Sequence, residues 1–134
     1  MFSFPKKEHL CGDKSIERLH KDGKSLLVYP LRVVYLPVEE EEVPVKVMVS
    51  VSKRKFKRAV KRNRVKRLMR EAYRLNKNDL IAFSEENNIA LHIAFQYIAT
   101  EIESFQKVNE KMQTALKKII RNLQLNNENV EETH

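Results

Sequence analysis

Hydrophobic and polar residues alternate with a period of two in three segments of the chain, and this period predicts β-strands. The alternation is clearest in residues 45–51, where valine occupies every second position. Residues 31–36 form a largely apolar, β-branched run, so both faces of that strand should be partly covered. Residues 89–97 alternate bulky side chains with small or polar ones, which is typical of a strand inside a sheet.

A period of three to four residues predicts three helices. Ser15 is placed to begin a short helix and Gly23 to end it. Thr100 and Glu103 have capping-box spacing ahead of a long closing helix, whose apolar stripe covers residues 105–123. The middle helix carries its apolar stripe at Val65, Leu68, Met69, Ala72 and Tyr73.

These elements predict an α+β fold in which helices pack on one small sheet. Their order is helix, at least two strands, helix, strand and helix. The length of 134 residues fits a single domain, which we place at residues 1–125. The residues before Ser15 are predicted to be loose, and the polar segment 126–134 is predicted to be a disordered tail.

Charge is concentrated in one part of the chain. Lysine and arginine number 26 against 18 aspartates and glutamates, which gives a formal net charge of +8. Residues 53–74 contain 12 basic residues and one acid, Glu71, a local charge of +11 that leaves −3 for the remainder. Such a segment favours a polyanionic partner, nucleic acid first and an anionic membrane surface second. A solvated surface helix is the alternative, although such helices usually interleave both signs.

Other features narrow the class of protein. Cys11 is the single cysteine, so neither an internal disulfide nor a cage of paired cysteines can form. The N-terminal residues have no signal-peptide core, and residues 26–36 are too short and too interrupted to span a membrane. We therefore expect a cytoplasmic protein with no membrane contact. The acidic run 39–42 is interpreted as a solvated hairpin loop, with metal binding as the minor alternative.

Residues for self-contained catalysis are not apparent, and we assign neither a catalytic residue nor a metal ligand. The sequence has no Gly-rich phosphate loop, nucleophile elbow or His-Glu-x-x-His motif. The four histidines are scattered. His92, on the smaller face of a predicted strand, is interpreted as packed or cleft-lining. Glu85 and Glu86 fall in a predicted loop, where they make an unconvincing acid and base pair.

Residues 47–75, VMVSVSKRKFKRAVKRNRVKRLMREAYRL, closely resemble the bacterial ribonuclease P protein component. The family's signature is an Arg-Asn-Arg run followed by further basic residues, a leucine and an aromatic residue. Here it is matched by Arg62, Asn63, Arg64, Lys66, Arg67, Leu68, Arg70 and Tyr73. The resemblance covers nearly the whole chain. It implies the order α-β-β-β-α-β-α, with three helices on a mixed sheet and a left-handed βαβ crossover, which general handedness rules do not predict.

The resemblance also implies a function. The protein would be the subunit of an endoribonuclease that joins a catalytic RNA to remove the 5′ leader from precursor tRNA. The RNA would hold the catalytic Mg2+, and the protein would bind RNA without supplying catalytic groups. The residues implied to contact the RNA subunit are Arg62, Asn63, Arg64, Lys66, Arg67 and Arg70. A cleft between the first helix and the sheet would bind the single-stranded leader through His20, Val33, Tyr35 and Lys53.

Two departures from the family pattern concern these contacts. The first helix has Ile16 and His20 where relatives offer aromatic residues to the cleft, and residues 54–58 have one apparent extra residue. The alternatives are a structured-RNA-binding or ribosome-assembly protein, which would bind RNA without changing its cleavage, and an autonomous nuclease, which would cleave without an RNA partner.

Overall fold

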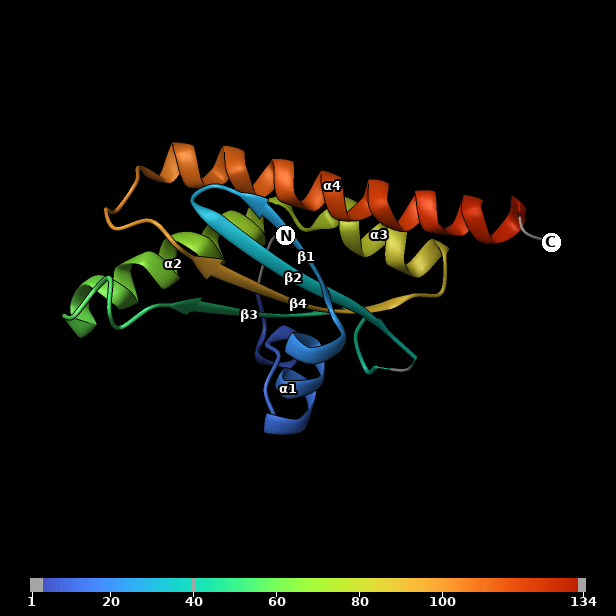
Figure 1. Ribbon diagram of the computed structural model, residues 1–134, viewed down its shortest axis with the longest axis horizontal. Coiled ribbons are helices and arrows are strands. Elements are labelled where there is room, and N and C mark those ends of the chain that lie inside the picture. Colours follow the sequence, from blue (N-terminus) through green and yellow to red (C-terminus); the bar gives the residue numbers. More distant parts are fainter. Residues whose placement is uncertain (1–3, 40, 133–134) are drawn as a thin grey trace.

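The computed structural model describes residues 4–39 and 41–132, with only the backbone described for 126–132. Within these described residues, nine elements follow one another (Figure 1). They are the 3-10 helix η1 (Lys6–Glu8), α1 (Asp13–Asp22), β1 (Lys24–Val28), β2 (Leu31–Val38), β3 (Val45–Val51), α2 (Ala59–Asn76), α3 (Asn78–Glu86), β4 (Ala90–Tyr97) and α4 (Phe105–Glu132).

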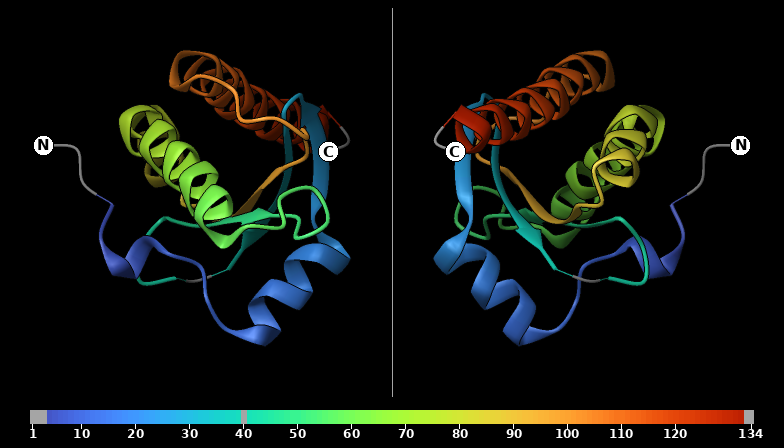
Figure 2. Two further views of the ribbon diagram at one scale, coloured as in Figure 1. Left: turned by 90° about the vertical axis from the view of Figure 1, so that its left-hand side faces the viewer. Right: turned by 90° about the vertical axis from the view of Figure 1, so that its right-hand side faces the viewer.

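The four strands form one mixed sheet in the order β1-β2-β4-β3. β1 and β2 form an antiparallel hairpin, and β2 also runs antiparallel to β4. β3 pairs parallel with β4, and the connection between them passes through α2 and α3. This crossover has the left-handed sense that the family resemblance implies (Figure 2). The basic segment 53–74 therefore comprises the loop that follows the edge strand β3 and most of α2.

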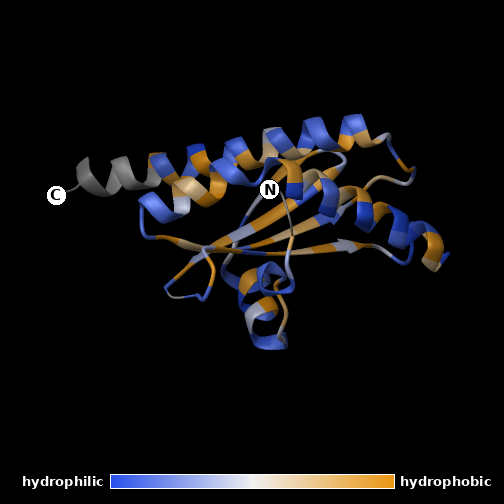
Figure 3. Cartoon of the chain, turned by 180° about the vertical axis from the view of Figure 1, so that it is seen from behind, coloured by the Kyte–Doolittle hydropathy of each residue, from blue (hydrophilic) through white to orange (hydrophobic). Residues whose placement is uncertain are grey.

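Two layers of helices cover the sheet. The helices α2 and α4 lie over one face, and α1 lies under the other (Figures 1 and 2). The larger core cluster lies on the α2 and α4 side and includes Tyr35, Tyr73 and Phe95, all essentially buried. The smaller cluster, under α1, includes Leu19 and Val34. The strands are coloured mainly as hydrophobic, whereas the helices alternate between both colours (Figure 3), which confirms the amphipathic patterns predicted for them.

The N-terminal segment is not loose where the structure describes it. Residues 4–10 run along the outer edge of β3, with the Leu10 N–H donating to the Val47 carbonyl at 2.8 Å and His9 forming a parallel bridge with Val47. Leu10 is buried against α1. The prediction of a loose segment was wrong here because its contacts lie far along the chain and leave no periodic pattern.

Several boundaries also differ from the prediction. The segment that includes Glu85 and Glu86, predicted to be a loop, belongs to α3. The helix α1 begins at Asp13, after Gly12, rather than at Ser15. Gly23 does end α1, and a Cβ there would collide with the Leu19 carbonyl and the Val34 side chain. The helix α4 continues to Glu132, within the predicted tail 126–134, whose last two residues lie outside the described residues.

Candidate nucleic-acid interface

The helix α2 has one face in the core and one in solvent. Val65, Met69, Ala72 and Tyr73 are fully buried, and Leu68 is partly buried against the same cluster. Four of the six predicted RNA-binding residues on this helix are exposed, namely Asn63, Arg64, Arg67 and Arg70, while Arg62 and Lys66 are half-buried. The apolar face therefore holds the helix on the sheet and leaves its cations available to a large partner.

The start of α2 is electrostatically unusual. Its first turn contains no acid, and its N-cap residue Arg58 makes no side-chain capping hydrogen bond. The N-terminal end of a helix carries a partial positive charge and exposed N–H groups, so cations there destabilise the helix and an anion stabilises it. Lys61, Arg62 and Arg64 add to that positive end. A phosphate group at this end would relieve the repulsion.

The basic loop between β3 and α2 is held in a defined conformation. Phe56 is buried, with its ring 6.0 Å from that of Tyr97. The Arg62 guanidinium donates to the carbonyl oxygens of Phe56 and Lys57 at 2.7 and 2.8 Å. Arg62 thus acts as a clamp that orders the loop, a role that the sequence motif alone did not indicate.

One cation of the segment is paired within the helix. Glu71 accepts hydrogen bonds from Arg74, and this bonding holds the pKa of the Glu71 carboxyl below its ordinary value despite the opposing effect of burial. Glu71 is the only acid of residues 53–74. The negative charge of Glu71 therefore lies at Arg74, near the C-terminal end of α2, and away from Arg64 and Arg67.

The structure does not bring the four predicted leader-binding residues together. His20 and Lys53 are exposed, but Val33 and Tyr35 are buried on the opposite face of the sheet, under α4. The Asn122 side-chain amide on α4 donates to the Tyr35 hydroxyl at 3.1 Å. The assignment of Val33 and Tyr35 to the cleft is corrected: a shift of one residue along a strand moves a side chain to the other face.

The face of the sheet beneath α1 presents other side chains. Val34, Ala94 and Met48 form a row across β2, β4 and β3 under α1. The next row in the same register is Arg32, Gln96 and Ser50. A cavity of about 210 Å³ lies beside this second row, and Lys55 from the basic loop also lines it. This polar row was not predicted from the sequence, although the small and polar positions of residues 89–97 contained the signal.

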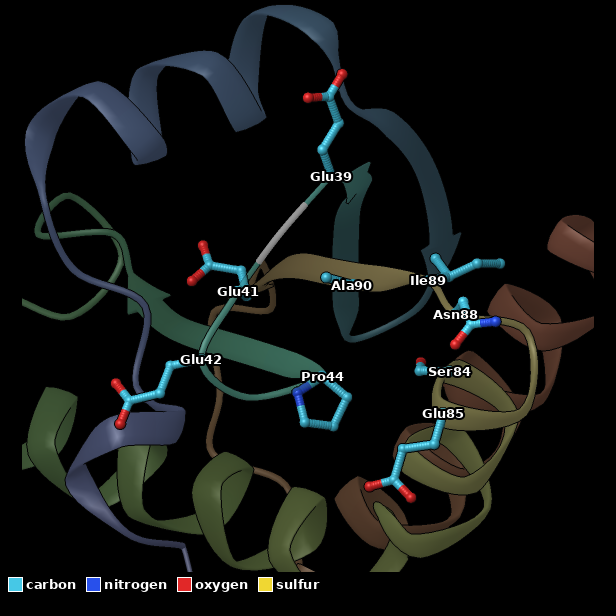
Figure 4. Close-up of a pocket in the computed structure, with 9 residues that line it drawn as sticks. All are labelled: Glu39, Glu41, Glu42, Pro44, Ser84, Glu85, Asn88, Ile89 and Ala90. Atoms are coloured by element: carbon cyan, nitrogen blue, oxygen red, sulfur yellow. The ribbon is translucent and has the colours of Figure 1, made fainter.

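A larger acidic pocket of about 740 Å³ lies at the other end of the sheet, between the β2–β3 connection and the end of α3 (Figure 4). The carboxylates of Glu39, Glu42 and Glu85 point in different directions and do not converge. The remaining carboxylate, Glu41, pairs with His92 and with Lys46, whose Nζ lies 2.9 Å away. His92 is buried, which confirms the prediction of a packed side chain, and its contact with Glu41 was not predicted.

Burial by itself raises the pKa of Glu41, but the hydrogen bonds and charges of Lys46 and His92 outweigh burial and lower the pKa from 4.5.

In the part of the chain that the structure describes, no three histidine, cysteine or acidic side chains are grouped so as to hold a metal ion. Within the same residues, no helix has both the length and the apolar composition needed to cross a bilayer.

Comparisons with known proteins give one family. The family model for ribonuclease P matches residues 4–120. The ribonuclease P protein component of Porphyromonas gingivalis is 46% identical over 123 residues, which cover 91% of this chain and 90% of the relative. That of Chlorobaculum tepidum is 35% identical over 130 residues, covering 90% and 84%.

Solved structures show the same fold. The RNase P protein of Staphylococcus aureus matches with a TM-score of 0.66 and 21% identity, covering 85% of this chain and 96% of that one. The RNase P protein of Thermotoga maritima matches with a TM-score of 0.64 and 23% identity, covering 83% and 96%. The relatives and the fold define the protein part of a ribonucleoprotein. The chain belongs to the ribonuclease P protein family, the protein subunits of an endoribonuclease of tRNA processing.

Proposed function

We propose that the exposed face of α2 and the loop before it bind the catalytic RNA of ribonuclease P. The observation that supports this most directly is the arrangement of α2, whose apolar face is buried while Asn63, Arg64, Arg67 and Arg70 are exposed. Arginine offers a planar fork of donors that matches phosphate oxygens, and asparagine can donate to and accept from RNA groups. The ordered loop adds Arg54, Lys57 and further cations beside them.

The charge distribution would orient the protein on the RNA. The acidic pocket lies where β3 begins. The basic helix α2 starts after β3 ends (Figure 1). The seven residues of β3 place these ends about 20 Å apart, which exceeds the screening length at physiological salt. A polyanion approaching the basic end is therefore little affected by the acidic end, while an approach from the acidic end is repelled.

The 5′ leader of precursor tRNA would lie on the sheet face beside α1, which retains the general position implied by the family resemblance. We propose Arg32, Ser50 and Gln96 as its contacts, together with Lys53 and His20, in place of Val33 and Tyr35. Arg32 supplies a cation, and Gln96 and Ser50 supply groups that both donate and accept hydrogen bonds. His20 Nδ1–H donates to the Ile16 carbonyl at 2.9 Å, which orients the His20 ring on α1.

The catalytic Mg2+ would be held by RNA. Residues 53–74 do not fit an inner-sphere magnesium site, because their only carboxylate, Glu71, is bonded to Arg74 and magnesium prefers oxygen ligands such as carboxylates. The protein would contribute by binding the catalytic RNA and the leader together, which positions the scissile phosphate among the RNA-bound ions.

Salt dependence of RNA binding tests this proposal. If about six basic contacts form, the logarithm of the affinity for a bacterial ribonuclease P RNA should fall with the logarithm of salt concentration at a slope of roughly −4 to −5. An Arg67→Ala, Arg70→Ala variant should have a slope shallower by about 1 to 2. A Lys117→Ala, Lys118→Ala variant, altered on the exposed face of α4, is the charge-matched control and should keep the wild-type slope. A wild-type slope near −1 would contradict the proposal.

A further inference from the structure

A small pocket lies between the N-terminal segment, β3 and α2 at the outer edge of the sheet. Its volume is about 200 Å³, of the order of one nucleobase, and it is distinct from the cavity beside α1. It is lined by Phe4, His9, Leu10, Val47, Met48, Val49 and Arg70. Its chemistry combines an aromatic wall, an apolar floor and one guanidinium group.

The aromatic wall consists of two stacked rings. The rings of Phe4 and His9 lie 4.0 Å apart with 23° between their planes. Phe4 is in turn fixed by an edge contact with Tyr73 at 5.3 Å and by Lys77, whose Nζ lies 5.8 Å from its ring centroid. Aromatic rings that are half-exposed and fixed in this way are the platforms on which unpaired bases stack.

A buried ion pair holds this wall in place. Lys77 Nζ lies 2.7 Å from Glu8 Oε1, and both side chains are largely buried. Burying two charges is expensive and is weak evidence for stability as such, but it fixes one arrangement of the groups involved. Here it fixes residues 4–10 beside β3, so the pocket exists before any ligand arrives.

The edge of β3 contributes hydrogen-bonding groups. The Val47 carbonyl points away from β4 and accepts from Leu10. Because backbone groups alternate sides along a strand, the N–H and C=O of Val49 point to the same side, beyond the end of the N-terminal segment. Among the described residues no backbone group pairs with Val49 on that side. One donor and one acceptor therefore face the pocket, a pattern that the edge of a nucleobase can match.

Charge identifies the class of ligand. Arg70 lines the pocket from the exposed face of α2, and the exposed Arg67 and half-buried Lys66 lie within one turn of it. A base in the pocket would have its backbone phosphates at these cations, whereas a peptide strand added to the β3 edge would have no use for them. We propose that this pocket binds one unpaired nucleotide of the partner RNA, with the base against Phe4 and His9 and its phosphate at Arg70. The proposal deepens, and rests on, the proposed binding of RNA by α2.

Nuclear magnetic resonance of the full chain tests the pocket directly. The probe is a single-stranded RNA of five adenosines, and ribose 5-phosphate serves as the probe without a base. We expect the pentamer to shift the backbone amides of Leu10 and Val49 and the ring signals of His9, and ribose 5-phosphate to leave these signals in place. Saturable pentamer binding that moves none of the three residues would overturn the proposal, as would equal shifts with the baseless probe or with an unstructured peptide.

Variants separate stacking from charge. His9→Ala should weaken the affinity fitted to the Val49 amide by about 5- to 150-fold, the range that stacking of one base spans. His9→Phe, which keeps a ring, should stay within about twofold of the wild type. Tyr29→Leu, which removes an exposed aromatic side chain at the β1–β2 turn, is the control and should bind as the wild type does.

Failure of the nucleotide pocket can be distinguished from failure of the proposed function. If the protein binds the catalytic RNA with a steep salt slope while His9→Ala and the wild type bind the pentamer equally, the pocket fails and the proposed function stands. If the wild type lacks the steep slope, the proposed function fails. Should His9→Ala not fold, the shifts of the wild-type protein with the two probes still decide the matter.

Discussion

Glu8 and Lys77 form an ion pair that joins the N-terminal segment to the junction of α2 and α3, across 69 positions of sequence. Both side chains are largely buried. If one partner is removed, the charge of the other either stays buried without water around it, or becomes hydrated because the N-terminal segment detaches from the sheet. Glu8 also lies close enough to Tyr73 to add to the effect of burial, which raises the pKa of the Tyr73 hydroxyl.

We expect Glu8→Ala to lower the free energy of unfolding by about 3 kcal/mol, the usual loss when a buried ion pair is broken. Urea unfolding followed by circular dichroism measures the change. Glu17→Ala, on the exposed face of α1, is the control and should change stability by less than about 0.5 kcal/mol. An unchanged unfolding midpoint for Glu8→Ala would show that the pair does not hold the segment.

The clamp formed by Arg62 gives a second prediction. Arg62→Lys keeps the charge but cannot reproduce the two hydrogen bonds to the Phe56 and Lys57 carbonyls. We expect Arg62→Lys to speed amide hydrogen exchange in residues 54–58 and to weaken RNA binding nearly as much as Arg62→Ala does. If the lysine variant binds RNA like the wild type, Arg62 acts through its charge alone.

The corrected assignment of the leader-binding residues gives a third prediction. Tyr35→Phe removes the hydroxyl that accepts from Asn122, and should cost about 1 kcal/mol of stability without changing how strongly the holoenzyme prefers precursor tRNA with a leader over mature tRNA. Arg32→Ala should reduce that preference and leave stability nearly unchanged, because Arg32 is exposed. The opposite pattern would indicate that Tyr35, and not Arg32, contacts the leader.

The ion pairs of Glu41 give a pH dependence. Because its pKa is lowered in the folded protein, the unfolded chain binds more protons just below pH 4.5, and stability from Glu41 is present above that pH and lost as the pH falls through the lowered pKa. The difference in unfolding free energy between the wild type and Glu41→Gln should therefore shrink between about pH 6 and pH 3. A constant difference over this range would mean that the carboxylate has no favourable partners in the fold.

Periodicity predicted most of the fold, because strands and helices with one buried face must repeat at fixed intervals. It identified the strand of residues 45–51, the face of the basic helix and the stripe of the closing helix. It could not identify β1, whose residues are mostly exposed, or α3, which is short and carries a weak pattern. Strand order came from no local signal, since β4 inserts between β2 and β3 through contacts distant in sequence.

The candidate site was predictable to the extent that charge is visible in sequence. The concentration of cations identified the exposed face of α2, and the apolar stripe showed which side was free. The leader-binding positions failed at Val33 and Tyr35 because residues 31–36 are apolar on both faces, so the pattern does not say which face lies under α1. The pocket at the β3 edge was hidden because it depends on residues 4–10, which were predicted to be loose.

The central claim is that the basic face of α2 supports cleavage by an RNA partner. The most direct measurement is cleavage of a precursor tRNA by a bacterial ribonuclease P RNA at low magnesium, without protein, with the wild type, and with an Arg64→Ala, Arg67→Ala variant whose folding is verified by thermal melting. We expect the wild type to stimulate cleavage, the variant to lose most of that stimulation, and the Lys117→Ala, Lys118→Ala control to retain it. If the wild type binds the RNA but does not stimulate cleavage, the claim is contradicted, and the alternative of a structured-RNA-binding protein is favoured.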